Sequence, residues 1–234
     1  MATNVIQDTQ AQTKPVKIET LNDALRLFLR FHSPRLILTV MVVAWIARIA
    51  VGSVSLWDLA IGLGVIAFWP FQEWLIHVFI LHFRPRTIFG RTVDLHVAAK
   101  HRIHHTAPWV LSDTFVPIRT LLQIVFLGLP IFIVAWSLVL PLSVGLTGVA
   151  VFATFGLVYE WIHYLVHTGW KPRSKWYRTL WQHHRWHHFK NENYWYGVTR
   201  LEGDMLLGTA PDSSEVETSP TARNLDGRGH RSEA

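Results

Sequence analysis

The sequence predicts an all-α integral membrane protein whose four transmembrane helices form two hairpins. Half of the 234 residues are hydrophobic, which is too apolar for an ordinary soluble domain. Four apolar segments of about 20 residues each are long enough to cross roughly 30 Å of hydrocarbon. The twelve tryptophans suit a protein that meets two membrane–water interfaces.

The polar N-terminal segment, residues 1–19, is predicted to be disordered. Thr20 to Asp23 has the pattern of a capping box and predicts a short helix within 20–33. Its apolar residues lie near one face, so we interpret it as an amphipathic helix at the membrane interface. A helix packed against the body of the protein is the alternative.

The membrane domain is predicted to cover residues 34–209, and the polar, Ser/Pro-rich residues 210–234 are predicted to be a disordered tail. Proline inside the second and third apolar segments, at Pro70 and Pro130, predicts a bend in each. The main alternative has two spans and two shorter re-entrant hairpins. The four predicted spans cover residues 36–52, 59–82, 120–140 and 142–167.

Arg48 lies in the first span, where a charged side chain is costly. Asp58 follows it across a short turn. We therefore predict that Arg48 pairs with Asp58.

Four spans place both termini on the same side of the membrane. Nearly all Lys and Arg residues lie on that side, whereas the opposite turns at 53–58 and 137–143 carry none. The positive-inside rule then makes the termini and the histidine clusters cytoplasmic. The net charge of +6 follows from residues that flank apolar segments, so anionic lipid headgroups, and not nucleic acid, are the expected partner.

Ten of the fourteen histidines fall in four short motifs. The two HxxHH motifs place histidines at i, i+3 and i+4 of a helix, which predicts three imidazoles directed at one point. The i, i+5 spacing of HVFILH requires the helix to loosen or end between its two histidines. The motifs supply His77 and His82, then His101, His104 and His105, then His163 and His167, and finally His184, His187 and His188.

The two halves of the chain share one plan. Each half has a hairpin, a Glu-Trp pair, a histidine pair, a basic loop and an HxxHH motif, and so supplies five clustered histidines. Two half-sites that face each other would suit two metal ions. Carboxylates near the motifs could accept hydrogen bonds from the ring N–H groups, and the candidates are Glu73, Glu160, Asp94 and Asp204.

Imidazole is a good ligand for Zn, Cu, Fe and Ni, and the absence of cysteine excludes thiolate sites. The chain contains neither the HExxH motif of metalloproteases nor the GxSxG motif of serine hydrolases. Two redox metals in a dry pocket suit oxygen activation against a C–H bond. A membrane zinc hydrolase and a metal transporter are the alternatives; a transporter would place its ligands along the spans.

These motifs, in this order and on this membrane plan, resemble the fatty acid hydroxylase/sterol desaturase superfamily of membrane di-iron oxygenases, from about Phe68 to Pro211. The sequence is most similar to the fatty acid 2-hydroxylase branch. The residues that carry this closer resemblance are Tyr159 to Tyr164, His187 to Phe189, Tyr196 to Thr199, and Gly208-Thr209.

The resemblance implies four transmembrane helices under a cytosolic helical cap, and two iron ions held by the ten histidines of the motifs. Zinc is a possible occupant in purified protein. His96 and His183 fall outside the motifs and are not expected to be ligands. Family members use O2 and two electrons to hydroxylate or desaturate a lipid. The lipid expected here is a fatty acyl chain, with sterols and carotenoids as alternatives. No fused cytochrome b5 domain is recognisable, so we expect a separate electron donor, cytochrome b5-like or ferredoxin-like, with its reductase.

Overall fold

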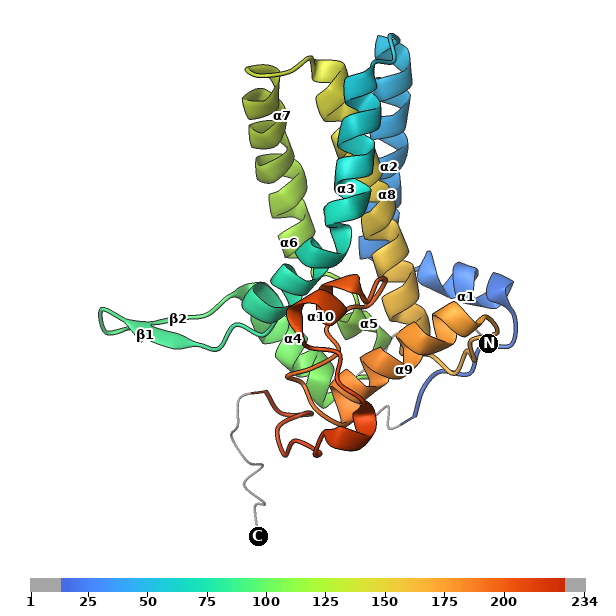
Figure 1. Cartoon of the computed structure of the whole chain (residues 1–234), viewed down its shortest axis with the longest axis vertical. Coiled ribbons are helices and arrows are strands. Elements are labelled where there is room, and N and C mark those ends of the chain that lie inside the picture. Colours follow the sequence, from blue (N-terminus) through green and yellow to red (C-terminus); the bar gives the residue numbers. More distant parts are fainter. Residues whose placement is uncertain (1–13, 226–234) are drawn as a thin grey trace. The chain divides into compact units, whose positions relative to one another are not determined.

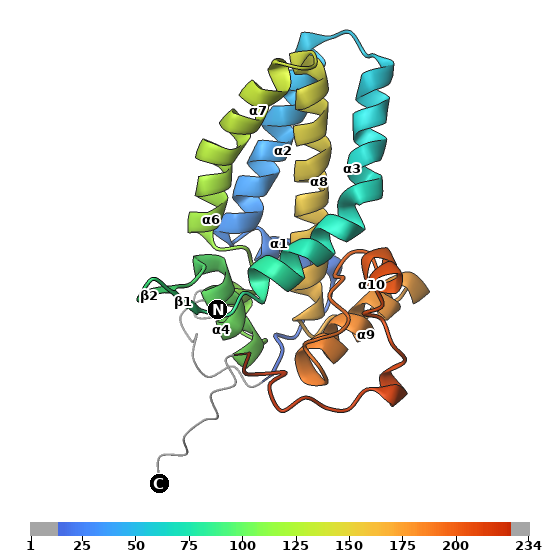
Figure 2. The ribbon, with the colours of Figure 1, turned by 60° about the vertical axis from the view of Figure 1, so that its left-hand side comes forward.

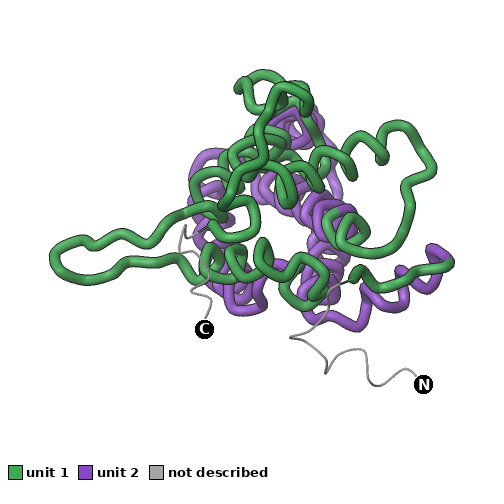
Figure 3. The backbone as a smooth tube through the Cα atoms, turned by 90° about the horizontal axis from the view of Figure 1, so that it is seen from below, with its two compact units in different colours: residues 1–19, 70–114, 163–234 green, residues 20–69, 115–162 purple. Residues whose placement is uncertain are grey.

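The computed structural model describes residues 14–225 of the chain. These residues form two compact units, which Figure 3 shows in two colours. Unit 1 contains residues 14–19, 70–114 and 163–225, and unit 2 contains residues 20–69 and 115–162. The first thirteen residues of the predicted disordered N-terminal segment lie outside the described part.

Unit 2 begins with α1 (Leu21–Phe28), whose cap is the predicted one: the Asp23 amide donates to Thr20 Oγ1 at 3.1 Å. Long apolar helices follow and lie side by side (Figures 1 and 2). They are α2 (His32–Val51), α3 (Leu56–Leu75), α6 (Ile118–Gln123) continued by η2 (Ile124–Gly128) and α7 (Leu129–Ser137), and α8 (Leu142–Val166). Unit 2 contains α3 up to Trp69 and α8 up to Ile162, and the last residues of both helices belong to unit 1.

Small side chains let these helices approach closely. Ala44 of α2 packs with Val149 and Ala150 of α8, and Leu129 and Ile133 of α7 pack against this cluster. Most of the remaining apolar side chains of the helices stay exposed, as expected for surfaces that face lipid.

Within residues 14–225, four helices are long and apolar enough to cross a membrane, in agreement with the number of predicted spans. The third span starts earlier than predicted and contains η2, a π-helical segment just before Pro130. Proline lacks the N–H that an α-helix needs, so a looser segment here accommodates it. The candidate spans are His32–Val51, Leu56–Leu81, Leu111–Ser137 and Leu142–Val166.

Unit 1 is mostly helical but also contains a two-stranded antiparallel hairpin, which an all-α prediction did not include. The hairpin pairs β1 (Arg86–Ile88) with β2 (Arg91–Val93). The sequence predicts a basic loop here, because strands of three residues are too short to show a clear alternating pattern. The helices of unit 1 are η1 (Ile76–Leu81), α4 (His96–Thr106), α5 (Leu111–Thr114), α9 (Lys175–Phe189), α10 (Glu202–Leu207) and the short η3 (Ser213–Glu215).

Both ends of the described chain are tied to unit 1. The Gly169 amide donates to the Val16 carbonyl at 2.8 Å, so residues 14–19 are ordered by a backbone contact. Residues 210–225 of the predicted disordered tail are also placed, and Ala222 and Leu225 are buried. The prediction failed here because the polar composition of the tail does not reveal backbone contacts.

The predicted ion pair is present in unit 2. Arg48 Nη2 lies 2.8 Å from Asp58 Oδ1, and both side chains are buried. Arg48 also donates to the Gly52 carbonyl at 2.7 Å, and Thr147 of α8 donates to Asp58 at 2.6 Å. The pair therefore joins three helices at one end of the bundle.

We expect Arg48→Asp to destabilise the protein by about 3–5 kcal/mol, because it leaves two carboxylates buried together. The swapped variant with Asp58→Arg should recover part of this loss. Thermal unfolding of detergent-solubilised protein measures both, with Arg178→Asp, at an exposed position of α9, as the control. A swapped variant no more stable than the single variant would contradict the pairing.

Candidate metal centre

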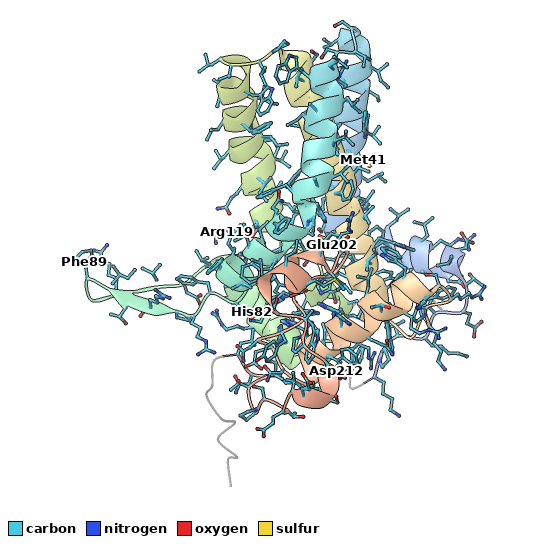
Figure 4. The ribbon with its side chains drawn as sticks, in the orientation of Figure 1. Met41, His82, Phe89, Arg119, Glu202 and Asp212 are labelled. Atoms are coloured by element: carbon cyan, nitrogen blue, oxygen red, sulfur yellow. The ribbon has the colours of Figure 1, made fainter. Side chains whose placement is uncertain are left out.

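All ten motif histidines lie in unit 1. They come from the η1 segment, α4, the end of α8 and α9. Nine of them are buried, and His82, which is labelled in Figure 4, is partly buried. Neither His96 nor His183 belongs to either of the groups that these ten form in the described part of the chain.

The i, i+5 spacing of the first motif is accommodated by a π-helix. The His82 amide donates to the His77 carbonyl at 3.0 Å, which is the i→i+5 bond of this geometry. The wider turn brings the two residues to the same side, with ring centroids 5.0 Å apart. The expectation that the helix loosens between them is therefore confirmed.

The ten rings form two groups of five. Within each group, one ligand atom per residue lies within 4.8 Å of every other, so five nitrogens converge on one space. The groups are adjacent, because the rings of His105 and His188 stack at 4.1 Å. Group 1 contains His77, His82, His101, His105 and His187; group 2 contains His104, His163, His167, His184 and His188.

The two halves of the chain exchange one ligand each. Group 1 takes four histidines from the first half and His187 from the second, whereas group 2 takes four from the second half and His104 from the first. Both exchanged residues are the i+3 histidine of an HxxHH motif. The prediction of three rings directed at one point is therefore wrong. Successive residues are about 100° apart on a helix, so i and i+4 stay together while i+3 and i+4 diverge.

The nitrogen geometry fits a metal ion. His184 Nε2 lies 3.1 Å from both His167 Nε2 and His188 Nε2. In group 1, His101 Nε2 and His105 Nε2 are 3.2 Å apart. Two neighbouring ligands at metal–nitrogen distances of about 2.1 Å are separated by about 3 Å. The donor sets thus have the spacing that a bound ion requires.

Backbone carbonyls fix the orientation of the group 1 rings. A carbonyl only accepts, so the Nδ1 atom that contacts it must carry the proton and the Nε2 lone pair remains for a metal. His77 Nδ1 donates to Tyr196 O at 2.7 Å, and His187 Nδ1 donates to Tyr194 O at 2.8 Å. The Nε2 atoms of His77 and His187 are buried without a hydrogen-bond partner.

Two buried carboxylates hold the segment that provides these carbonyls. Glu73 accepts from the Val198 and Thr199 amides at 2.5 and 2.8 Å and from Thr199 Oγ1 at 2.6 Å. Asp204 accepts from the Tyr196 and Gly197 amides at 3.0 and 2.6 Å. The sequence predicts that these carboxylates accept hydrogen bonds from ring N–H groups. In the structure they bind backbone amides instead, and so act on the rings through the backbone.

The other two candidate carboxylates also have different partners from those expected. Glu160 accepts from Ser33 Oγ at 2.7 Å and from the Val116 amide at 3.0 Å, all within unit 2. Asp94 forms an ion pair with Arg102. Both therefore stabilise local structure.

The third acceptor carbonyl of group 1 comes from the C-terminal segment. His105 Nδ1 donates to Ala222 O at 2.9 Å. This segment is held by the Ser219 amide, which donates to Lys190 O at 2.7 Å, and by Thr221, which donates to Glu192. Sequence reasoning missed the carbonyls of Tyr194, Tyr196 and Ala222, because any residue type can supply a backbone acceptor.

Burial keeps the imidazoles neutral. It lowers the pKa of His101, His104, His184 and His188 well below the usual value, and neighbouring rings lower it further. Burial also lowers the pKa of His105 to about 4, although the hydrogen bond to Ala222 acts in the opposite direction. Neutral imidazoles keep their lone pairs, so protons do not compete with a metal at neutral pH.

These observations define an integral membrane protein with a histidine-rich centre that could hold metal ions. Residues 62–209 match the family described as fatty acid hydroxylase. Because the match covers more than half of the chain, the chain belongs to the fatty acid hydroxylase family, as the motifs predicted.

The chain is similar to curated fatty acid 2-hydroxylases. It is 32% identical over 152 residues to the fatty acid 2-hydroxylase of Mus musculus, which covers 64% of this chain and 39% of that protein. It is 29% identical over 157 residues to a dihydroceramide fatty acyl 2-hydroxylase of Arabidopsis thaliana, covering 65% of this chain and 61% of that protein. The chain thus spans about two fifths of the length of the mouse relative.

A solved structure shares the fold. The structure of full-length scs7p, in which only the hydroxylase domain is visible, superposes with a TM-score of 0.61 at 23% identity. The likeness covers 80% of this chain and 68% of that one.

We expect Glu73→Ala to lower stability by about 2–4 kcal/mol, because three buried donors lose their acceptor. Glu202→Ala is the matched control, since Glu202 is partly exposed and pairs with Arg200 near the surface. Thermal unfolding in detergent compares the two variants. Equal midpoints would show that Glu73 does not hold the segment.

We also expect the metal-free protein to lose stability as the pH falls from 6.5 towards 4. The unfolded chain takes up protons on its histidines below about 6.5, whereas burial keeps the folded rings neutral, as the lowered pKa of His105 illustrates. Unfolding midpoints of chelator-treated protein between pH 7 and 5 test this. The variant His105→Gln should show a shallower dependence, and a flat profile for the unaltered chain would be the contrary result.

Proposed function

We propose that the chain is a membrane-bound di-iron monooxygenase that hydroxylates a fatty acyl chain. The observation that carries the proposal is the pair of adjacent five-histidine groups in a member of the fatty acid hydroxylase family. Two iron ions bound there would supply the activation of O2 that attack on an unreactive C–H bond requires. The reaction consumes one O2, two electrons and two protons, and yields the hydroxylated lipid and water.

The histidines would hold the metal ions, and backbone carbonyls orient the histidine rings. Each group would bind one ion through five nitrogens, with His104 and His187 linking the halves of the chain. Tyr194, Tyr196 and Ala222 hold ring orientation through their carbonyls. Burial of the rings excludes water, which protects a reactive oxidant from side reactions. Imidazole also suits zinc, so the choice of iron follows from the family, and zinc remains a possible occupant of purified protein.

The names of the relatives support a fatty acyl substrate and carbon 2 as the position of attack. The fatty acyl chain is favoured over sterols and carotenoids because the similar curated proteins are fatty acyl 2-hydroxylases. The electrons are proposed to come from a separate cytochrome b5-like or ferredoxin-like donor with its reductase.

The membrane orientation is proposed from the distribution of charge. Basic residues flank the histidine motifs, and the turns at the other ends of the spans lack Lys and Arg, which supports cytoplasmic histidine clusters and termini. The four-span plan of two hairpins and a membrane domain over 34–209 is supported by the family match at 62–209.

The decisive measurement is metal content per chain together with lipid products. The unaltered protein should carry two irons, and lipids from cells that express it under oxygen-18 gas should contain labelled 2-hydroxy acyl chains. His104→Ala and His187→Ala should each lose metal and abolish the product, because each removes a ligand of a different group. His183→Ala is the control.

Three results would count against this assignment. A folded His187→Ala variant with full metal content and activity would remove His187 from the site. Product without the oxygen label would exclude a monooxygenase. Metal uptake into sealed vesicles without product would favour a transporter.

A further inference from the structure

The β1–β2 hairpin of unit 1 carries an exposed aromatic residue at its tip. Phe89 is completely exposed, at 101%, and Figure 4 labels it at the end of the projecting ribbon. A large apolar side chain in this position contributes no burial to the fold. Favourable contacts for this ring must come from outside the described part of the chain.

The backbone conformation at the tip is unusual for a phenylalanine. Phe89 and Gly90 both have positive φ, at 49° and 73°, as a two-residue hairpin turn requires. Asn, Asp or Gly adopt this conformation readily, whereas a side chain such as Phe pays a steric cost there. The turn therefore accepts strain to present an aromatic ring that the fold itself does not use.

The rest of the hairpin combines apolar and basic side chains. Arg86 pairs with Val93 and Ile88 with Arg91, which places all four on one face of the ribbon, while Thr87 and Thr92 lie on the other. All are exposed, and residues 83–93 contain no acidic residue. An apolar tip between arginines is the pattern of segments that enter a headgroup layer of anionic lipid.

The hairpin is also close to a membrane-spanning segment along the chain. The second candidate span ends at Leu81, and β1 begins at Arg86. Five residues reach at most about 17 Å, so the base of the hairpin stays near the end of the span. A stable protein partner would need about 20–30 residues on this side, and the ten residues 84–93 fall well short of that.

From these observations we infer that the β1–β2 hairpin is a lipid-binding element: Phe89 and Ile88 insert into the headgroup region, and Arg86 and Arg91 bind the phosphates of anionic lipids. This function is independent of the chemistry of the histidine centre. It would anchor unit 1 to the surface of the membrane that the spans cross.

The chain lacks cysteine, so a single spin label can be placed on the full-length protein in nanodiscs. A label at Phe89→Cys should collide with lipid-soluble oxygen and be shielded from an aqueous nickel chelate. The oxygen-to-nickel collision ratio should rise when phosphatidylglycerol is added to phosphatidylcholine. Arg86→Glu with Arg91→Glu should reduce that ratio by about fivefold or more in the anionic discs.

The matched control is a label at Thr218→Cys, an exposed site in the C-terminal segment, which should stay accessible to nickel in both lipids. Three results would overturn the inference. Accessibility to nickel at position 89 in both lipids would place the tip in water. Shielding from both reagents would indicate a contact with protein. An oxygen-to-nickel collision ratio that changes neither with anionic lipid nor with the charge reversal would exclude headgroup binding by the arginines.

Discussion

The protonation of one imidazole nitrogen is the constraint on which this structure depends. A buried neutral ring directs the lone pair of one nitrogen at a metal while its other nitrogen keeps the proton, and a hydrogen bond from that N–H to an acceptor fixes this arrangement. In group 1 the acceptors of His77, His187 and His105 are backbone carbonyls. These carbonyls come from two segments far along the chain from η1 and α4, so the packing of the late part of unit 1 determines the orientation of rings in its early part.

The buried carboxylates contribute to the same constraint indirectly, because they hold the backbone segment whose carbonyls accept from the rings. Glu73 and Asp204 are both on helices, and together they bind the consecutive amides of Tyr196 to Thr199. These hydrogen bonds fix the backbone from Tyr196 to Thr199, and with it the position of the Tyr196 carbonyl that accepts from His77. Because both carboxylates bind backbone amides and not ring N–H groups, each of the two groups is a set of five imidazoles.

The sequence predicted the features that depend on residues close to one another along the chain. The ten histidines, the loosened turn between His77 and His82, and the pair of Arg48 with Asp58 all follow from short-range periodicity and the cost of burial. The division of the rings between the groups could not be predicted, because it depends on how α4 and α9 face each other. The β hairpin was missed because its pairing is short, and the C-terminal segment because the carbonyl of Ala222 has no signature.

The bond between His105 and Ala222 has a consequence for the order of synthesis. A ribosome makes the chain from its N-terminus, and the early histidines of group 1 are complete long before residue 222 is added. Until then, His105 lacks the acceptor that selects its tautomer. The hydrogen bond that orients His105 can therefore form only after residue 222 has been translated, well after the histidines of α4.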